Sequence, residues 1–161
     1  MTQWIIDSAR ALERTQLADF VRGSRYLYPV LESLHILGIA LMVGAAIAMD
    51  LRLLGVARNV PVTTVARLLP LSHGGFALVA VTGVLMFFAI AFSVTTSVFA
   101  PWKFGLIAVA AINILVFHFG AYRNVTRWDV DKGTPVAAKV SAAVSATCWT
   151  GVIVCGRFLA Y

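Results

Sequence analysis

Charged side chains are scarce in this sequence. Lysine, arginine, aspartate and glutamate together make up 12% of the 161 residues, whereas 60% of the residues are hydrophobic. A soluble globular domain carries about 25% charged residues, so this composition excludes an ordinary soluble protein. It predicts an integral membrane protein whose first partner is the lipid bilayer. The formal net charge of +6 then reflects loop residues that set topology, and nucleic acid is not an expected partner.

Reactive motifs are scarce as well. The two cysteines, Cys148 and Cys155, lie seven residues apart on an expected helix, about 10 Å from each other and beyond disulfide reach. No phosphate-cradling glycine loop and no nucleophile elbow is present, so hydrolytic chemistry is not expected and enzymatic activity is left open. The first twenty residues carry charges throughout and no continuous apolar core, so we expect no cleavable signal peptide.

Long apolar runs dominate what is present. Crossing about 30 Å of hydrocarbon takes roughly 20 helical residues, and four runs reach that length. They are residues 28–49, 71–93, 102–122 and 139–161. The sequence therefore predicts an all-α fold, a four-helix transmembrane bundle that occupies residues 28–161.

Residues 1–27 differ from the rest in composition. Apolar and charged side chains alternate there at roughly helical intervals, a pattern typical of an amphipathic helix that lies on the membrane surface. We therefore expect an N-terminal interfacial helix followed by a linker, and a helix that only caps the bundle stays open as an alternative. The apolar members of the pattern are Trp4, Ile5, Leu12, Leu17, Phe20 and Val21.

The distribution of basic residues predicts a topology. Four spans place both termini and the second loop on one face of the membrane, with the first and third loops on the other. Near the spans, arginine and lysine favour the face of loops one and three, which is typical of the cytoplasmic side. We expect a multi-pass protein of the bacterial inner membrane with periplasmic termini.

Small residues recur at four-residue spacing in the first and fourth runs. This spacing lets helix backbones approach closely, and it also leaves room for a flat cofactor. The residues are Ala40, Gly44, Ala48, Ala138, Ala142 and Ala146.

His73 and His118 are expected at one depth. Each lies about 5 Å inside the face of loops one and three, because a helix rises about 1.5 Å per residue. Two histidines on different helices at one level are what an axially ligated haem b requires, although such histidines also occur as interfacial polar residues. Gly74 and Gly75 would give the macrocycle space. Two loop arginines are the expected propionate partners: Arg67 and Arg123.

A second group of ionisable residues lies toward the terminus face. Glu32 and His35 share a helix face because they are three residues apart, and Lys103 and Arg157 belong to neighbouring spans at a similar level. A carboxylate-bridged metal pair needs more acids than the spans contain. Two interpretations stay open, namely an ion-pair cluster and a site for proton or quinone exchange.

Three segments carry a resemblance. "YPVLESLHILGIALMVGAAIAMDLRLLG", "PWKFGLIAVAAINILVFHFGAYR" and "GVIVCGRFLAY" resemble an uncharacterised family of small bacterial four-span inner-membrane proteins, from which no function carries over. More distantly, the chain is similar to CopD-like copper-resistance proteins and to four-helix membrane cytochromes b. The CopD likeness covers only "LH" and "WKF". A diheme cytochrome b implies four ligating histidines, and this chain has three.

Two classes of function follow. The first is an integral membrane electron-transfer protein that binds haem b between its spans and exchanges electrons with quinone or a partner. The second is a non-redox module: a copper-handling or small-solute transport protein, or an accessory subunit of a larger membrane complex. A homo-oligomer is compatible with both classes.

Overall fold

The chain folds into helices and short connections. The structure, a computed structural model, describes residues 3–129 and 133–159. The elements are α1 (Gln3–Glu13), α2 (Gln16–Gly23), α3 (Leu27–Leu54), α4 (Val62–Val65), η1 (Ala66–Leu68), α5 (Leu69–Thr96), α6 (Phe99–Phe119), η2 (Ala121–Arg127) and α7 (Val136–Phe158). Helices α3 and α5 contain the first two predicted spans, whereas α6 and α7 overlap the third and fourth but end at Phe119 and Phe158, three residues before the predicted ends. All four helices are long and apolar enough to cross a membrane. The predicted four-helix bundle is confirmed.

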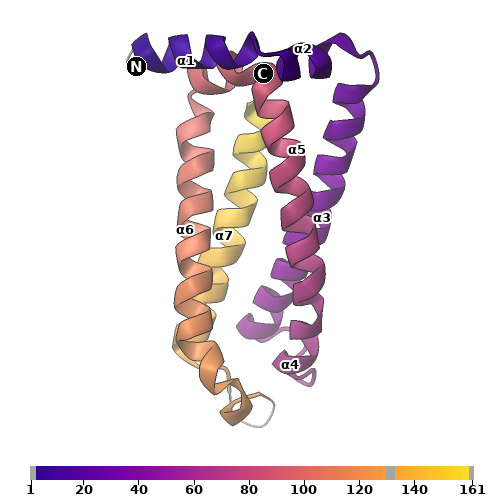
Figure 1. Cartoon of the computed structure of the whole chain (residues 1–161). Helices are drawn as coiled ribbons and strands as arrows, with labels where there is room; N and C mark the ends of the chain where they lie inside the picture. Colours follow the sequence, from indigo (N-terminus) through magenta and orange to yellow (C-terminus); the bar gives the residue numbers. More distant parts are fainter. Residues whose placement is uncertain (1–2, 130–132, 160–161) are drawn as a thin grey trace.

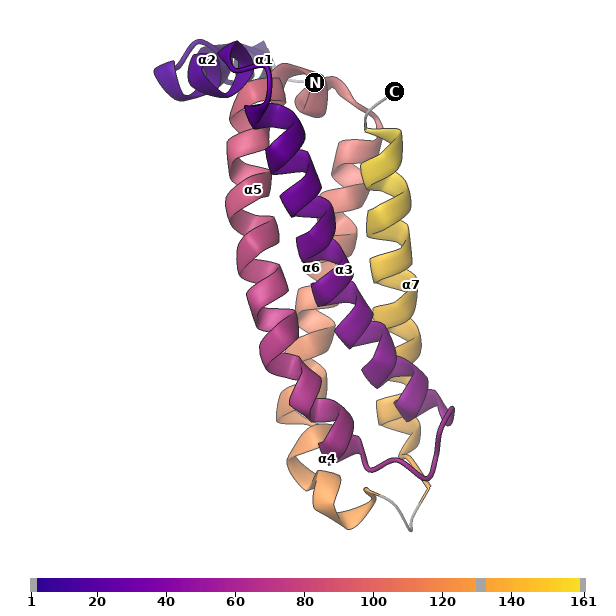
Figure 2. The same ribbon diagram turned by 90° about the vertical axis from the view of Figure 1, so that its right-hand side faces the viewer.

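The four long helices pack side by side in the order α5, α3, α7 and α6. Helix α3 lies between α5 and α7, and α7 packs on α6, whereas α5 and α6 contact each other little although they are consecutive in the chain. Figure 2 shows α3 between α5 and α7, with α6 behind them. Loops one and three lie at one end of the bundle, and α1 and α2 lie at the other (Figure 1). The arrangement gives a multi-pass topology, with α3 as its central helix.

Two glycines set the distance between α3 and α5. A Cβ atom on Gly75 would lie 2.7 Å from the backbone nitrogen of Met42 and 2.8 Å from the carbonyl oxygen of Gly38. The two backbones therefore touch at this crossing, which only glycine permits. The stripe predicted on the first span is not the contact face, because Ala40 and Gly44 are exposed. On α7 the prediction is better, since Ala138 and Ala142 are buried.

Residues 3–23 form two short helices instead of one. Thr15 separates them: its hydroxyl donates to the Leu12 carbonyl at 2.7 Å and accepts from the Ala18 amide at 3.3 Å, so it joins the end of α1 to the N-cap of α2. Both helices lie crosswise over the end of the bundle (Figure 1) and pack on α5. Trp4 and Phe20 remain exposed, as expected of helices at a membrane surface.

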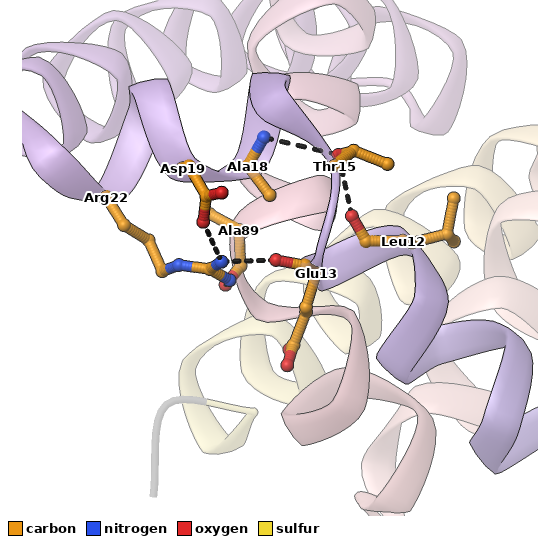
Figure 3. A network of polar contacts seen from close by, with 7 residues as sticks. All are labelled: Leu12, Glu13, Thr15, Ala18, Asp19, Arg22 and Ala89. Carbon is orange, nitrogen blue, oxygen red and sulfur yellow. Dashed lines mark hydrogen bonds and ion pairs between the residues drawn. The ribbon is translucent and has the colours of Figure 1, made fainter.

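The helical geometry of α5 is interrupted near its end, and side chains of α1 and α2 form hydrogen bonds with backbone groups next to the interruption. Ile90 has φ −134° and ψ 28°, which interrupts the helical hydrogen-bond ladder. The Arg22 guanidinium donates to the freed carbonyl of Ala89 at 3.1 Å, and the Glu13 carboxylate accepts from the freed amide of Phe92 at 2.8 Å. Figure 3 shows Arg22 also reaching Asp19 and the Glu13 carbonyl. In a membrane span such freed groups need partners, and the surface helices supply them.

At the opposite end, loops one and three are tied together. The buried Arg52 side chain donates to the carbonyls of Val60 and Asp129. The Asp129 carboxylate accepts from the backbone amide of Thr63 at 3.2 Å and from its hydroxyl at 2.6 Å. Gly55, with φ +105°, ends α3 in the left-handed conformation, which glycine adopts without steric cost. This turn lets the first loop fold back toward the third.

Candidate functional site

His35 is the histidine that the structure places inside the bundle. It is half-buried on α3, and its Nδ1 lies 2.8 Å from the Thr82 hydroxyl oxygen on α5. Gly83, the next residue, leaves room for the ring, because a Cβ atom there would lie 3.1 Å from the His35 Cε1. Ionisable side chains within a span are expected to face the bundle interior; His35 does so, whereas Glu32 on the same helix is exposed. Thr82, the partner of His35, was not predicted, because it lies on a different helix in an otherwise apolar run.

The hydrogen bonds around Thr82 favour one tautomer of His35. The Thr82 hydroxyl donates its one hydrogen to the Leu78 carbonyl at 2.7 Å, with the Val79 carbonyl at 3.3 Å. When that hydrogen goes to the Leu78 carbonyl, the Thr82 oxygen is left to accept a hydrogen bond from His35 Nδ1–H. A neutral imidazole has one N–H, so in this tautomer the lone pair lies on Nε2, which is then available as a ligand.

Lys103 of α6 is the cation nearest to this site. Its ammonium lies close enough to His35 for an electrostatic interaction, and its Nζ would be 3.6 Å from a Cβ atom on Gly156 of α7. The side chain is half-buried within a span, and no ion pair joins it to another described residue. A cation inside a bundle normally finds an anionic partner. The site therefore offers one imidazole nitrogen and one positive charge.

The other two members of the predicted cluster are placed differently. Glu32 is exposed on α3, and no ion pair connects it with Lys103 within residues 3–129 and 133–159. Three residues on a helix leave the two side chains only about 60° apart, and at this separation His35 is half-buried against α5 while Glu32 is exposed. Arg157 is exposed near the end of α7. The structure thus brings His35 and Lys103 together and leaves Glu32 at the surface.

The predicted pair His73 and His118 does not form a buried site. Both imidazoles are exposed, and the His118 ring stacks on Tyr122 with centroids 5.1 Å apart. On α5 the cause is the angle around the helix axis. Gly75 faces α3, and His73, two residues earlier, lies about 200° around the helix from Gly75. On α6, Phe117 packs on the buried cluster and His118 is rotated by about 100° from it.

The glycine and the two arginines that were also predicted for a haem site at that end do not form a site either. Gly75 gives no space to a macrocycle, because the backbone of α3 fills it. Arg67 in η1 and Arg123 in η2 are both exposed. No group of three or more histidine, cysteine, aspartate or glutamate side chains that could hold a metal ion is found among the described residues. The site with the most defined chemistry is therefore the one at His35 and Lys103.

Comparisons with known proteins add no assignment. No family model, no curated protein and no solved structure matches the chain. Function is therefore argued from the site alone.

Proposed function

We propose that this protein is a membrane b-type haem protein that transfers electrons, and that His35 is an axial ligand of the haem iron. The haem, once bound, supplies a one-electron couple that exchanges with quinone or with a protein partner. This assignment moves the ligand role from His73 and His118 to His35. It rests on the orientation of the His35 imidazole by Thr82.

The contact between His35 Nδ1 and the Thr82 hydroxyl is the observation that carries the proposal. A histidine that binds a metal commonly donates its other ring N–H to a protein acceptor, which fixes the ring and raises the basicity of the ligating nitrogen. Here Thr82 accepts from Nδ1 at 2.8 Å and leaves the Nε2 lone pair free. Because α3 and α5 are held together at Gly38 and Gly75, this orientation is set before any ligand arrives.

Lys103 supports the same ligand class. A haem carries two propionate carboxylates, and a half-buried ammonium without an ion-pair partner among the described residues suits one of them. A ligand that has both a metal centre and an attached carboxylate uses His35 and Lys103 together. A bare copper ion would use only the imidazole, which favours haem over copper handling.

The position of the site fits electron exchange on the terminus side. His35 is eight residues after the start of α3, so it lies about 12 Å along the helix from that end. Helices α5 and α6, which carry Thr82 and Lys103, contact each other little. A quinone or a partner protein can then approach from that side of the bundle, where the cluster was predicted to exchange protons or electrons.

The test is absorption spectroscopy on protein produced with added haem precursor and purified in detergent. We expect a Soret band that shifts on reduction with dithionite, and we expect the band to disappear in His35→Ala. His73→Ala and His118→Ala are the matched controls, and both variants should keep the pigment. Lys103→Met should bind haem more weakly, by roughly tenfold for the loss of one charge-assisted contact of about 1.5 kcal/mol.

Two results would overturn the proposal. One is a colourless, folded protein after haem supply, which would favour the non-redox class. The other is an unchanged spectrum in His35→Ala. Because an alanine variant can also lose pigment by failing to fold, Thr82→Val serves as a second probe: it should retain haem but shift the reduction potential, since the hydrogen bond to Nδ1 tunes the ligand.

A further inference from the structure

A buried acid lies in the half of the bundle opposite to His35. Asp50 is 5% exposed on α3, four residues before the helix ends at Leu54. Its Oδ2 has no hydrogen-bond partner among the described residues. On α7, the Ser145 hydroxyl lies within hydrogen-bonding reach of the Asp50 carboxyl. An acid in this position plays no part in the proposed haem site.

Among the residues that the structure describes, no cation is placed to neutralise Asp50. Arg52, two residues along α3, turns away to the loop carbonyls of Val60 and Asp129. Lys139 on α7 and His73 on α5 are exposed. The one salt bridge found in the described part of the chain joins Arg22 to Asp19. An ionised carboxylate without a partner inside a membrane bundle is costly, and the simplest way to remove that cost is to bind a proton.

A second unsatisfied group lies on the same helix interface. The indole Nε1 of Trp149 is buried and also lacks a hydrogen-bond partner among the described residues, one helical turn after Ser145 on α7. Trp149 packs against Met42 and Val43 of α3, the helix that carries Asp50. The α3–α7 interface therefore holds an unpaired acceptor at Asp50 and, about two turns of α3 away, an unpaired donor at Trp149, and a bound proton would satisfy the acceptor.

We propose that Asp50 and Ser145 form a proton-binding site. The Asp50 carboxylate takes up one proton to become a neutral carboxylic acid, and no electron moves in this step. The acid lies about 6 Å from the end of α3, so the proton enters and leaves on the side of loops one and three. Ser145 holds the carboxyl group by a hydrogen bond to it.

Infrared difference spectroscopy in lipid bilayers at mildly acidic pH, where an ordinary aspartate is still ionised, tests this site. We expect the carbonyl stretch of a protonated carboxylic acid in the wild type and its loss in Asp50→Asn, a change that keeps the shape of the side chain. Ser145→Ala should shift the frequency of that band without abolishing it, which a purely structural role for Ser145 would not predict. Glu32→Gln is the matched control, and it should leave the band unchanged because Glu32 is exposed.

Two outcomes would overturn the proposal. In the first, Asp50→Asn removes a carboxylate band, which means that Asp50 is ionised. In the second, replacing choline by sodium in the buffer abolishes the acid band, which means that the site binds a metal cation. If Asp50→Asn fails to fold, an apolar carbodiimide that reacts with protonated carboxyl groups decides on the wild type. Mass mapping should find the adduct on Asp50, and its absence there would count against the proposal.

Discussion

The contact between Glu13 and the break in α5 leads to a quantitative prediction. In Glu13→Ala the Phe92 amide, two residues after the non-helical Ile90, loses its acceptor at 2.8 Å. A hydrogen bond to a charged group contributes about 1.5–3 kcal/mol. We therefore expect Glu13→Ala to lower the free energy of unfolding by about that amount. Glu13→Gln should lose less, about 1 kcal/mol, since the amide oxygen still accepts.

The assay is amide hydrogen exchange of the protein in detergent micelles, together with its resistance to denaturant. Exchange at Phe92 should become roughly ten- to hundredfold faster in Glu13→Ala, because each 1.4 kcal/mol corresponds to a factor of ten. Asp7→Ala is the matched control, since it removes the same charge from an exposed position on α1. Equal exchange at Phe92 in both variants would refute the reasoning, and the break would then be stable without the surface helices.

Two further predictions concern packing and pH. In a thermal unfolding assay, Gly75→Ala should lower the free energy of unfolding by about 1–3 kcal/mol or more, because the added Cβ would lie 2.8 Å from the Gly38 carbonyl oxygen. Gly44→Ala is the control: a Cβ there would meet nothing within 4 Å, so this variant should be nearly neutral in the same thermal unfolding assay. Asp129 lies outside the spans; partial desolvation raises its pKa, but hydrogen bonds from Thr63 outweigh this and hold the pKa below 3.8. A carboxyl group whose pKa is lower in the folded protein than in the unfolded chain stabilises the fold at pH values above its unfolded pKa. This stabilisation is lost as the pH falls through the pKa of the folded protein. Wild type should therefore lose stability below about pH 4 relative to Asp129→Asn, and equal pH profiles would contradict this.

The four spans were predictable because each is an apolar run of sufficient length, a signal that depends on local sequence alone. The break in α5 was not predictable in the same way. The segment around Ile90 contains no proline or glycine, the usual causes of a sharp kink. It is satisfied by Glu13 and Arg22, about seventy residues earlier in the chain. Such a feature depends on tertiary contacts, which periodicity does not show.

The candidate site was predicted in part for a related reason. The cost of an ionisable group in a span indicated that His35 faces inward, and the structure places it there. The pairing of His73 with His118 considered depth along the helices but not the angle around them. Depth follows from counting residues, whereas the angle depends on which face of α5 packs on α3. That face is set by Gly75, whose contact with α3 could not be read from one sequence.

The buried face of α5 explains how Thr82 comes to orient His35. Gly75, Thr82 and Ala89 are all buried and lie seven residues apart, so they share one face of the helix, since seven residues make about two turns. At Gly75 this face touches the backbone of α3, and at Ala89 its carbonyl accepts from Arg22 of α2. Thr82 lies midway between two fixed points. Its hydroxyl therefore has little freedom to move, and the orientation of the His35 imidazole follows from helix packing at sites about 10 Å away on either side.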